Sequence, residues 1–173
     1  MVSWTLLLFR LVHVVGGVFW VGTVLFLAGF LFPTVRAVGP AGGPVMQQLT
    51  QHQRLPLYLM GAGILTVLSG LGLYWHDSAG FRSAWLGTRP AMIYGVGAVL
   101  AIVAVGMGMA INAPTARRLG ALSETIRAGG MPPSADQAAA LQDMQRRLDS
   151  ATRLAAVLLV LATIAMAVAR YVP

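Results

Sequence analysis

The sequence predicts an all-α membrane protein, a bundle of four transmembrane helices. Hydrophobic residues make up 57% of the 173 residues and charged residues only 10%, whereas about 25% of a soluble domain is charged. Four apolar segments are each long enough to cross a bilayer, which takes about 20 residues. Most charged residues lie between these segments. We therefore expect residues 1–173 to form a single integral membrane domain.

The four predicted spans cover residues 3–32, 56–75, 90–111 and 151–171. Pro33 is expected to end the first span, because proline lacks the N–H that continues a helix. Pro56 and Pro90 suit the opening turns of the second and third spans. The first apolar segment lacks a basic leader and is too long for the core of a signal peptide, so we interpret it as a span.

The segment 113–150 is expected to form a helical hairpin rather than a simple loop. Apolar residues recur at helical spacing in both of its arms: Leu119, Leu122 and Ile126, then Leu141, Met144 and Leu148. Glycines and prolines separate the arms, and Ser134 followed by Gln137 predicts a capping box. The second arm should continue into the fourth span. The alternative is a flexible linker.

The arginines predict how the bundle is oriented. All twelve basic residues are arginine, and eight of them flank the first and third links: Arg36, Arg54, Arg117, Arg118, Arg127, Arg146, Arg147 and Arg153. Only Arg82 and Arg89 lie in the second link. Positive charge is retained on the cytoplasmic side, so the hairpin should be cytoplasmic. Both termini should then face outward from a bacterial inner (cytoplasmic) membrane.

A charged and an imidazole side chain inside the first span mark a candidate site. Arg10 and His13 lie three residues apart and share a helix face. A charge within a span costs about 2.5–3.5 kcal/mol on insertion scales, so it indicates a function. Gly17 and Trp20 continue the same face. Gly17 would leave space for a flat ligand beside His13, and it equally suits close helix packing.

The fourth span repeats this pattern, since Met166 lies at the depth of His13 and Arg170 lies one turn beyond it. Haem iron takes axial His, or His with Met, and arginines suit the haem propionates. The sequence therefore predicts haem b held by His13 and Met166, with Arg10 and Arg170 at the propionates. His76 could join the propionate end.

Other interpretations remain open for the same residues. His13 and Met166 are also acceptable ligands for copper(I). Alternatively, His13 and Met166 are packing residues, and Arg170 extends to the membrane surface. The absence of cysteine excludes disulfides and thiolate metal sites. The arginines surround apolar spans instead of covering a soluble face, which argues against a nucleic-acid partner.

Several short motifs resemble those of a known group of proteins. The motifs are LVHVVGGVFWVG with a closing proline, GILTVLSGLGLYW, WLGTRPAMIYG and MAVARY, and they are distributed from the first predicted span to the fourth. They resemble the helices of four-helix bacterial membrane proteins, a group that includes CopD-type copper-resistance domains, their uncharacterised relatives and HemJ-type protoporphyrinogen oxidases. The uncharacterised CopD-like relatives are the most similar.

The resemblance implies that His13 corresponds to the histidine that these families place in their first helix, which HemJ-type proteins use for haem. HemJ-type proteins also carry a lysine early in the third helix. This chain has Met92, Ile93 and Tyr94 there and contains no lysine. That departure argues against protoporphyrinogen oxidase activity, and the sequence does not decide whether the protein is an enzyme.

Three functions are consistent with these observations. The first is a b-type haem protein for electron transfer or redox-ligand handling near the outer leaflet, with a redox partner or a quinone. The second is copper binding or transport without haem. The third is a structural subunit in which Arg10 serves a protein interface. In each case the lipid bilayer is a partner, and a homo-oligomer is compatible with the sequence.

Overall fold

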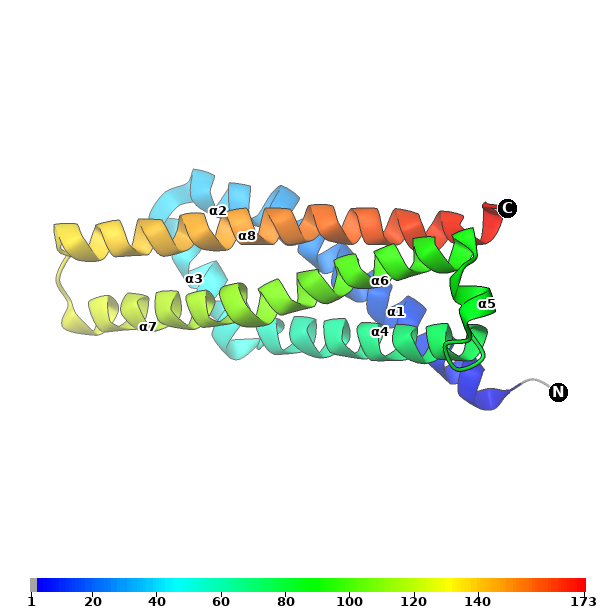
Figure 1. Ribbon diagram of the computed structural model, residues 1–173. Coiled ribbons are helices and arrows are strands. Elements are labelled where there is room, and N and C mark those ends of the chain that lie inside the picture. The colour runs from blue at the N-terminus through cyan, green and yellow to red at the C-terminus, as the bar shows by residue number, and fades with distance from the viewer. Residues whose placement is uncertain (1–2) are drawn as a thin grey trace.

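The computed structural model describes residues 3–173, apart from the side chains of Pro40 and Ser83. It is an elongated bundle in which the long helical runs lie side by side (Figure 1). All regular structure within these residues is helical. Both termini lie at one end of the bundle, which we call the terminal end, and the turn between α7 and α8 lies at the other, the hairpin end.

The helices follow in chain order, with π-helical turns at η1, η3 and η4 and 3-10 turns at η2 and η5: α1 (Trp4–Phe26), η1 (Leu27–Leu31), α2 (Phe32–Val38), η2 (Gly39–Ala41), α3 (Gly42–Gln47), η3 (Gln48–His52), α4 (Leu55–Asp77), α5 (Ser83–Leu86), α6 (Arg89–Met107), η4 (Gly108–Asn112), α7 (Ala113–Gly129), α8 (Ala135–Val168) and η5 (Ala169–Tyr171). Four helical runs are long and apolar enough to cross a membrane: Trp4–Val38, Leu55–Asp77, Arg89–Gly129 and Ala135–Tyr171.

The first helical run does not end at Pro33, so that prediction was wrong. The chain passes through η1 directly into α2, where Pro33 occupies the first turn. A π-turn changes the hydrogen-bonding register, and a first-turn position needs no N–H donor from proline. The run ends instead at Gly39, whose φ of 63° is readily reached only by glycine.

The remaining helix boundaries agree better with the sequence. Pro56 and Pro90 lie in the first turns of α4 and α6, as predicted. The third run extends past residue 111, however, because η4 joins α6 to α7 without a break. Both arms of the segment 113–150 are helical, as predicted, and α8 continues without a break from the second arm into the fourth predicted span. Ser134 and Gln137 form the predicted capping box.

Small residues allow the helices to approach one another closely. The buried core contains many alanines, including Ala104, Ala155 and Ala162, together with Leu159 and Trp20. Large apolar side chains are instead exposed around the outside of the bundle. In water this arrangement would be unfavourable, but it is typical of helices that pack in lipid, where small residues line the contacts between helices.

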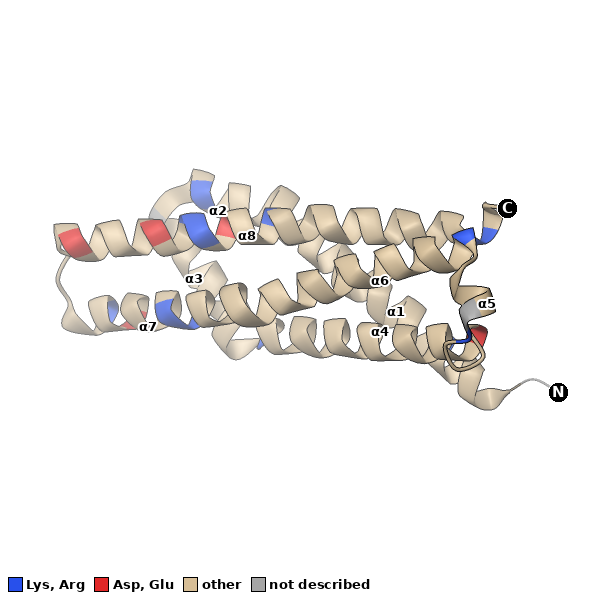
Figure 2. Ribbon diagram, in the orientation of Figure 1, with Lys and Arg blue, Asp and Glu red and all other residues tan. Residues whose placement is uncertain are grey.

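Charged residues lie toward the two ends, and an uncharged length of α4, α6 and α8 separates them (Figure 2). Asp149 of α8 accepts from Arg36 of α2 at 3.0 Å and from Arg153 at 3.2 Å. Burial alone would raise the pKa of Asp149, but the two guanidinium groups outweigh it and lower that pKa. This ion-pair network ties α2 to α8 beside the apolar part of the bundle.

Candidate functional site

A cavity of about 690 Å³ opens between the helices at the terminal end. Helices α1, α4 and α6 and the end of α8 with η5 all contribute to its wall, and we call it the His13 cavity. Its lining includes Arg10, His13, Thr66, Gly70, Tyr74, His76, Tyr94, Met166 and Arg170. Its volume falls within the range of about 300–1,000 Å³ that is typical of ligand and cofactor sites.

A hydrogen bond across the α1–α4 contact orients the His13 ring. Its Nδ1 lies 2.8 Å from the carbonyl oxygen of Thr66. Because a carbonyl can only accept, Nδ1 must donate, and the proton of a neutral ring is therefore on Nδ1. Nε2, on the far edge of the ring, is left with its lone pair. A hydrogen bond of this kind is the usual support for a histidine that binds a metal.

Glycine in α4 makes room for that ring. A Cβ atom added to Gly70 would lie 2.7 Å from Cε1 and 2.8 Å from Nδ1 of His13. Such distances are too short, so any side chain at Gly70 would displace the ring. The absence of a side chain therefore allows His13 to lie against the backbone of α4 and reach the Thr66 carbonyl.

Met166, near the C-terminal end of α8, lines the same cavity. Its terminal methyl group packs against Gly97 of α6, where an added Cβ would lie 3.0 Å from Cε. Two candidate ligands, His13 and Met166, thus come from the first and last long helices to the wall of one cavity.

Arg10 and Arg170, the two arginines that the sequence singled out within the predicted spans, also line this cavity. The Arg170 guanidinium stacks over the ring of Tyr171, 5.1 Å from its centroid. Within residues 3–173, neither Arg10 nor Arg170 makes an ion pair with an acidic side chain. Asp77, the acid nearest to them in the predicted topology, instead pairs with His76 at 3.3 Å.

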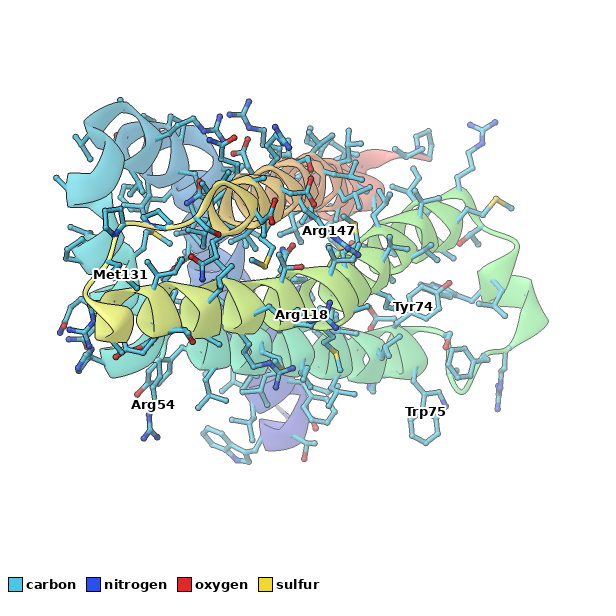
Figure 3. The ribbon with its side chains drawn as sticks, turned by 90° about the vertical axis from the view of Figure 1, so that its left-hand side faces the viewer. Arg54, Tyr74, Trp75, Arg118, Met131 and Arg147 are labelled. Atoms are coloured by element: carbon cyan, nitrogen blue, oxygen red, sulfur yellow. The ribbon has the colours of Figure 1, made fainter. Side chains whose placement is uncertain are left out.

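Aromatic side chains support the cavity at the terminal end. Tyr74 packs edge-on against Trp85 at 5.0 Å between centroids, and its hydroxyl donates to the carbonyl of Ala91 at 3.2 Å. Figure 3 shows Tyr74 turned toward α5 and Trp75 turned away from the bundle. His76 lines the cavity, and its side chain is more than half exposed.

Two residues that the sequence placed at the cofactor do not line the His13 cavity. Gly17 faces α4, where an added Cβ would lie 3.5 Å from the Thr66 methyl group, so it serves the close helix contact. Trp20 is only 6% exposed and packs against Gly63 in the core. On a helical projection both residues share the face of His13. In the structure, α4 packs directly against that face at Gly17 and Trp20.

The His13 cavity combines features that suit a flat, apolar, anionic ligand. Its lining offers the imidazoles of His13 and His76, the thioether of Met166 and the two guanidinium groups. The carboxylate of Asp77 and a few hydroxyl groups also belong to it, and the rest of the wall is largely apolar. Within residues 3–173, no group of three or more His, Asp or Glu side chains is arranged to hold a metal ion. A bare ion usually takes about four ligands, whereas a haem iron needs only one or two from the protein.

Comparison with known proteins gives no family for this chain. No protein-family model matches it, and no curated protein or solved structure is detectably similar to it. The site is therefore argued from its own residues.

Sequence reasoning did not single out Thr66 or Gly70. Thr66 acts through its backbone carbonyl, which carries no residue-specific signal. Gly70 is one of several glycines in the spans, and all of them were equally well explained by close packing. Only the pairing of α1 with α4 shows which glycine faces His13.

Proposed function

We propose that this protein is a membrane-embedded b-type haem protein that transfers electrons or handles a redox ligand near the outer leaflet. The observation that carries the proposal is the convergence of His13, Met166, Arg10 and Arg170 on one cavity of about 690 Å³. These residues come from opposite ends of the chain, so their convergence is not a consequence of proximity in sequence.

The residues present fit the group chemically. His13 would hold the haem iron through Nε2, because Nδ1 donates to the Thr66 carbonyl at 2.8 Å. Met166 would be the second ligand. Arg10 and Arg170, two cations without acidic partners in residues 3–173, would hold the propionates by charge-assisted hydrogen bonds. The haem would supply a one-electron redox centre, and the apolar walls would limit its contact with water.

Copper is the competing occupant of the same cavity. His13 and Met166 together form a donor pair that copper(I) accepts. Two unpaired arginines favour haem instead, because they would repel a cation and attract carboxylates. The resemblance to CopD-like and HemJ-like proteins is compatible with either occupant.

The membrane orientation is part of the proposal. The eight arginines at the first and third links support a cytoplasmic hairpin end. The His13 cavity would then open toward the outer face of a bacterial inner membrane.

The visible absorption spectrum of the purified protein, with iron and copper analysis, tests this function. A Soret band with stoichiometric iron is expected, and His13→Ala should abolish it while the helical content persists. His52→Ala is the matched control, because His52 is an exposed histidine in η3. Stoichiometric copper without a Soret band would show that the protein binds copper instead of haem. Neither metal in the protein, or an unchanged spectrum in His13→Ala, would overturn the proposal.

A further inference from the structure

A second, smaller cavity lies between the same four helical runs, on the hairpin side of the His13 cavity. Its volume is about 130 Å³, and its lining includes Trp20 of α1, Leu59 of α4, Ala104 of α6 and Ala155 of α8. We call it the Asn112 cavity. The nearest lining residues of the two cavities on α4 are Gly63 and Thr66, which are separated by about 4.5 Å along the helix axis.

Irregular helical turns surround the Asn112 cavity. Each of the three π-helical turns in residues 3–173 contributes to its wall: Leu27 from η1, Thr50 from η3 and Asn112 from η4. Single π-turns inside α-helices occur frequently at functional sites. Three such turns from distant parts of the chain surround this one cavity, which makes it a candidate binding site.

One polar atom in this wall lacks a partner. The Oδ1 atom of Asn112 is buried and accepts no hydrogen bond from the described residues. Its Nδ2 donates to Thr152 Oγ1 over a long distance of 3.5 Å. A buried acceptor without a donor destabilises a fold. A ligand that donates a hydrogen bond would remove that penalty.

We propose that the Asn112 cavity binds the ring of a lipid-soluble hydroquinone, with one ring hydroxyl donating to Asn112 Oδ1. At about 130 Å³ the cavity is slightly smaller than an apolar cavity of about 150 Å³ that accommodates benzene, so its volume limits the ligand to a single ring. Trp20, Met60 and Met109 line the cavity, and aromatic and thioether groups pack well against an aromatic ring. The hydroxyl donor complements the unpaired oxygen.

The surface of the bundle supports a ligand that arrives from lipid. Large apolar side chains are exposed on all four helical runs around the cavity, for example Phe26, Leu57, Val103 and Leu154. A molecule with an alkyl tail would partition into the bilayer beside these helices. This site is independent of the haem assignment, because none of the proposed haem contacts lines the Asn112 cavity.

Titration calorimetry of the purified protein in a neutral detergent tests the proposal. The probe is 2-decyl-benzene-1,4-diol, and its dimethyl ether is the matched control that has no hydroxyl donor. We expect saturable binding of one diol per chain. The ether should bind at least about threefold more weakly, because it cannot make the hydrogen bond. Equal binding of both molecules, or binding of neither, would overturn the proposal.

Two variants locate the binding site. Asn112→Leu removes the acceptor at similar size and should weaken diol binding about three- to tenfold, with no fall in the unfolding temperature of the ligand-free protein. Ala116→Phe should block binding by filling the cavity that Ala116 lines. Arg82→Gln is the control and should bind the diol like the wild type, because Arg82 is exposed and lines neither cavity. Unchanged affinity in the first two variants would exclude this cavity. If Asn112→Leu lowers the unfolding temperature and leaves the diol affinity unchanged, Asn112 stabilises the fold and does not bind the ligand.

Discussion

The Nδ1 atom of His13 lies 2.8 Å from the carbonyl oxygen of Thr66, across the contact between α1 and α4. This contact depends on Gly70, which lies four residues after Thr66 on the same helix and has no side chain to hold the ring away. The two helices therefore fix both the position and the protonated nitrogen of the one histidine in the first span.

Gly70→Ala should weaken haem binding about 10- to 100-fold, the usual effect of disturbing the support of a metal ligand. The added Cβ would lie 2.7 Å from the His13 ring and displace it. Retention of haem is measured from the Soret absorbance during titration with apomyoglobin. Gly61→Ala is the control, since an added Cβ there meets nothing within 4 Å. Equal haem retention in the two variants would show that the ring position is unimportant.

Arg10→Gln and Arg170→Gln should each weaken haem retention about tenfold, because each removes a charge-assisted hydrogen bond to a propionate. The unfolding temperature should change little, since neither arginine makes an ion pair within residues 3–173. Arg82→Gln is the control, an exposed arginine outside the lining of the His13 cavity. Parallel losses of haem and of stability would instead assign the arginines a structural role.

Asp149→Asn should destabilise the fold by about 1 kcal/mol, since the two arginines that it holds are half-exposed. The pKa of Asp149 is lowered in the folded protein. Its stabilising contribution is thus complete above the ordinary carboxylate pKa of about 3.9 and is lost as the pH falls through the lower folded value. Thermal unfolding between about pH 6 and 3 measures this.

The control for that measurement is Asp143→Asn, because the Asp143–Arg146 pair is largely exposed on both sides. It should change stability by less than about 0.5 kcal/mol. If the two variants show the same pH dependence, the network of Arg36, Asp149 and Arg153 contributes nothing beyond an ordinary surface pair.

A reporter that is active only in the cytoplasm should give no signal when it is attached to Pro173, and it should give a strong signal when inserted at Met131. The reason is the arginine bias toward the hairpin end. Met131 is exposed at the turn between α7 and α8 (Figure 3), so an insertion there should be tolerated. The reverse pattern of signals would invert the topology and place the His13 cavity on the cytoplasmic side.

The sequence by itself determined the helical class, the four apolar helical runs and the hairpin arms. Apolar length and helical spacing are local properties, and Ser134 caps α8 through Gln137, only three residues away. The prediction that Pro33 ends the first span was wrong, because the proline itself gives no sign that a π-turn precedes it. The sequence also marked His13, Met166, Arg10 and Arg170, since charge and soft donors are rare within apolar segments.

Only the tertiary structure decided which marked residues share a cavity. Gly17 and Trp20 lie on the same face of α1 as His13, but their neighbours on α4, Thr66 and Gly63, turn them into packing residues. The neighbour of His13 on α4 is Gly70, which allows the ring to reach a backbone carbonyl. A helix face acquires its role from the helix that packs against it, and that pairing depends on contacts between residues more than 50 positions apart.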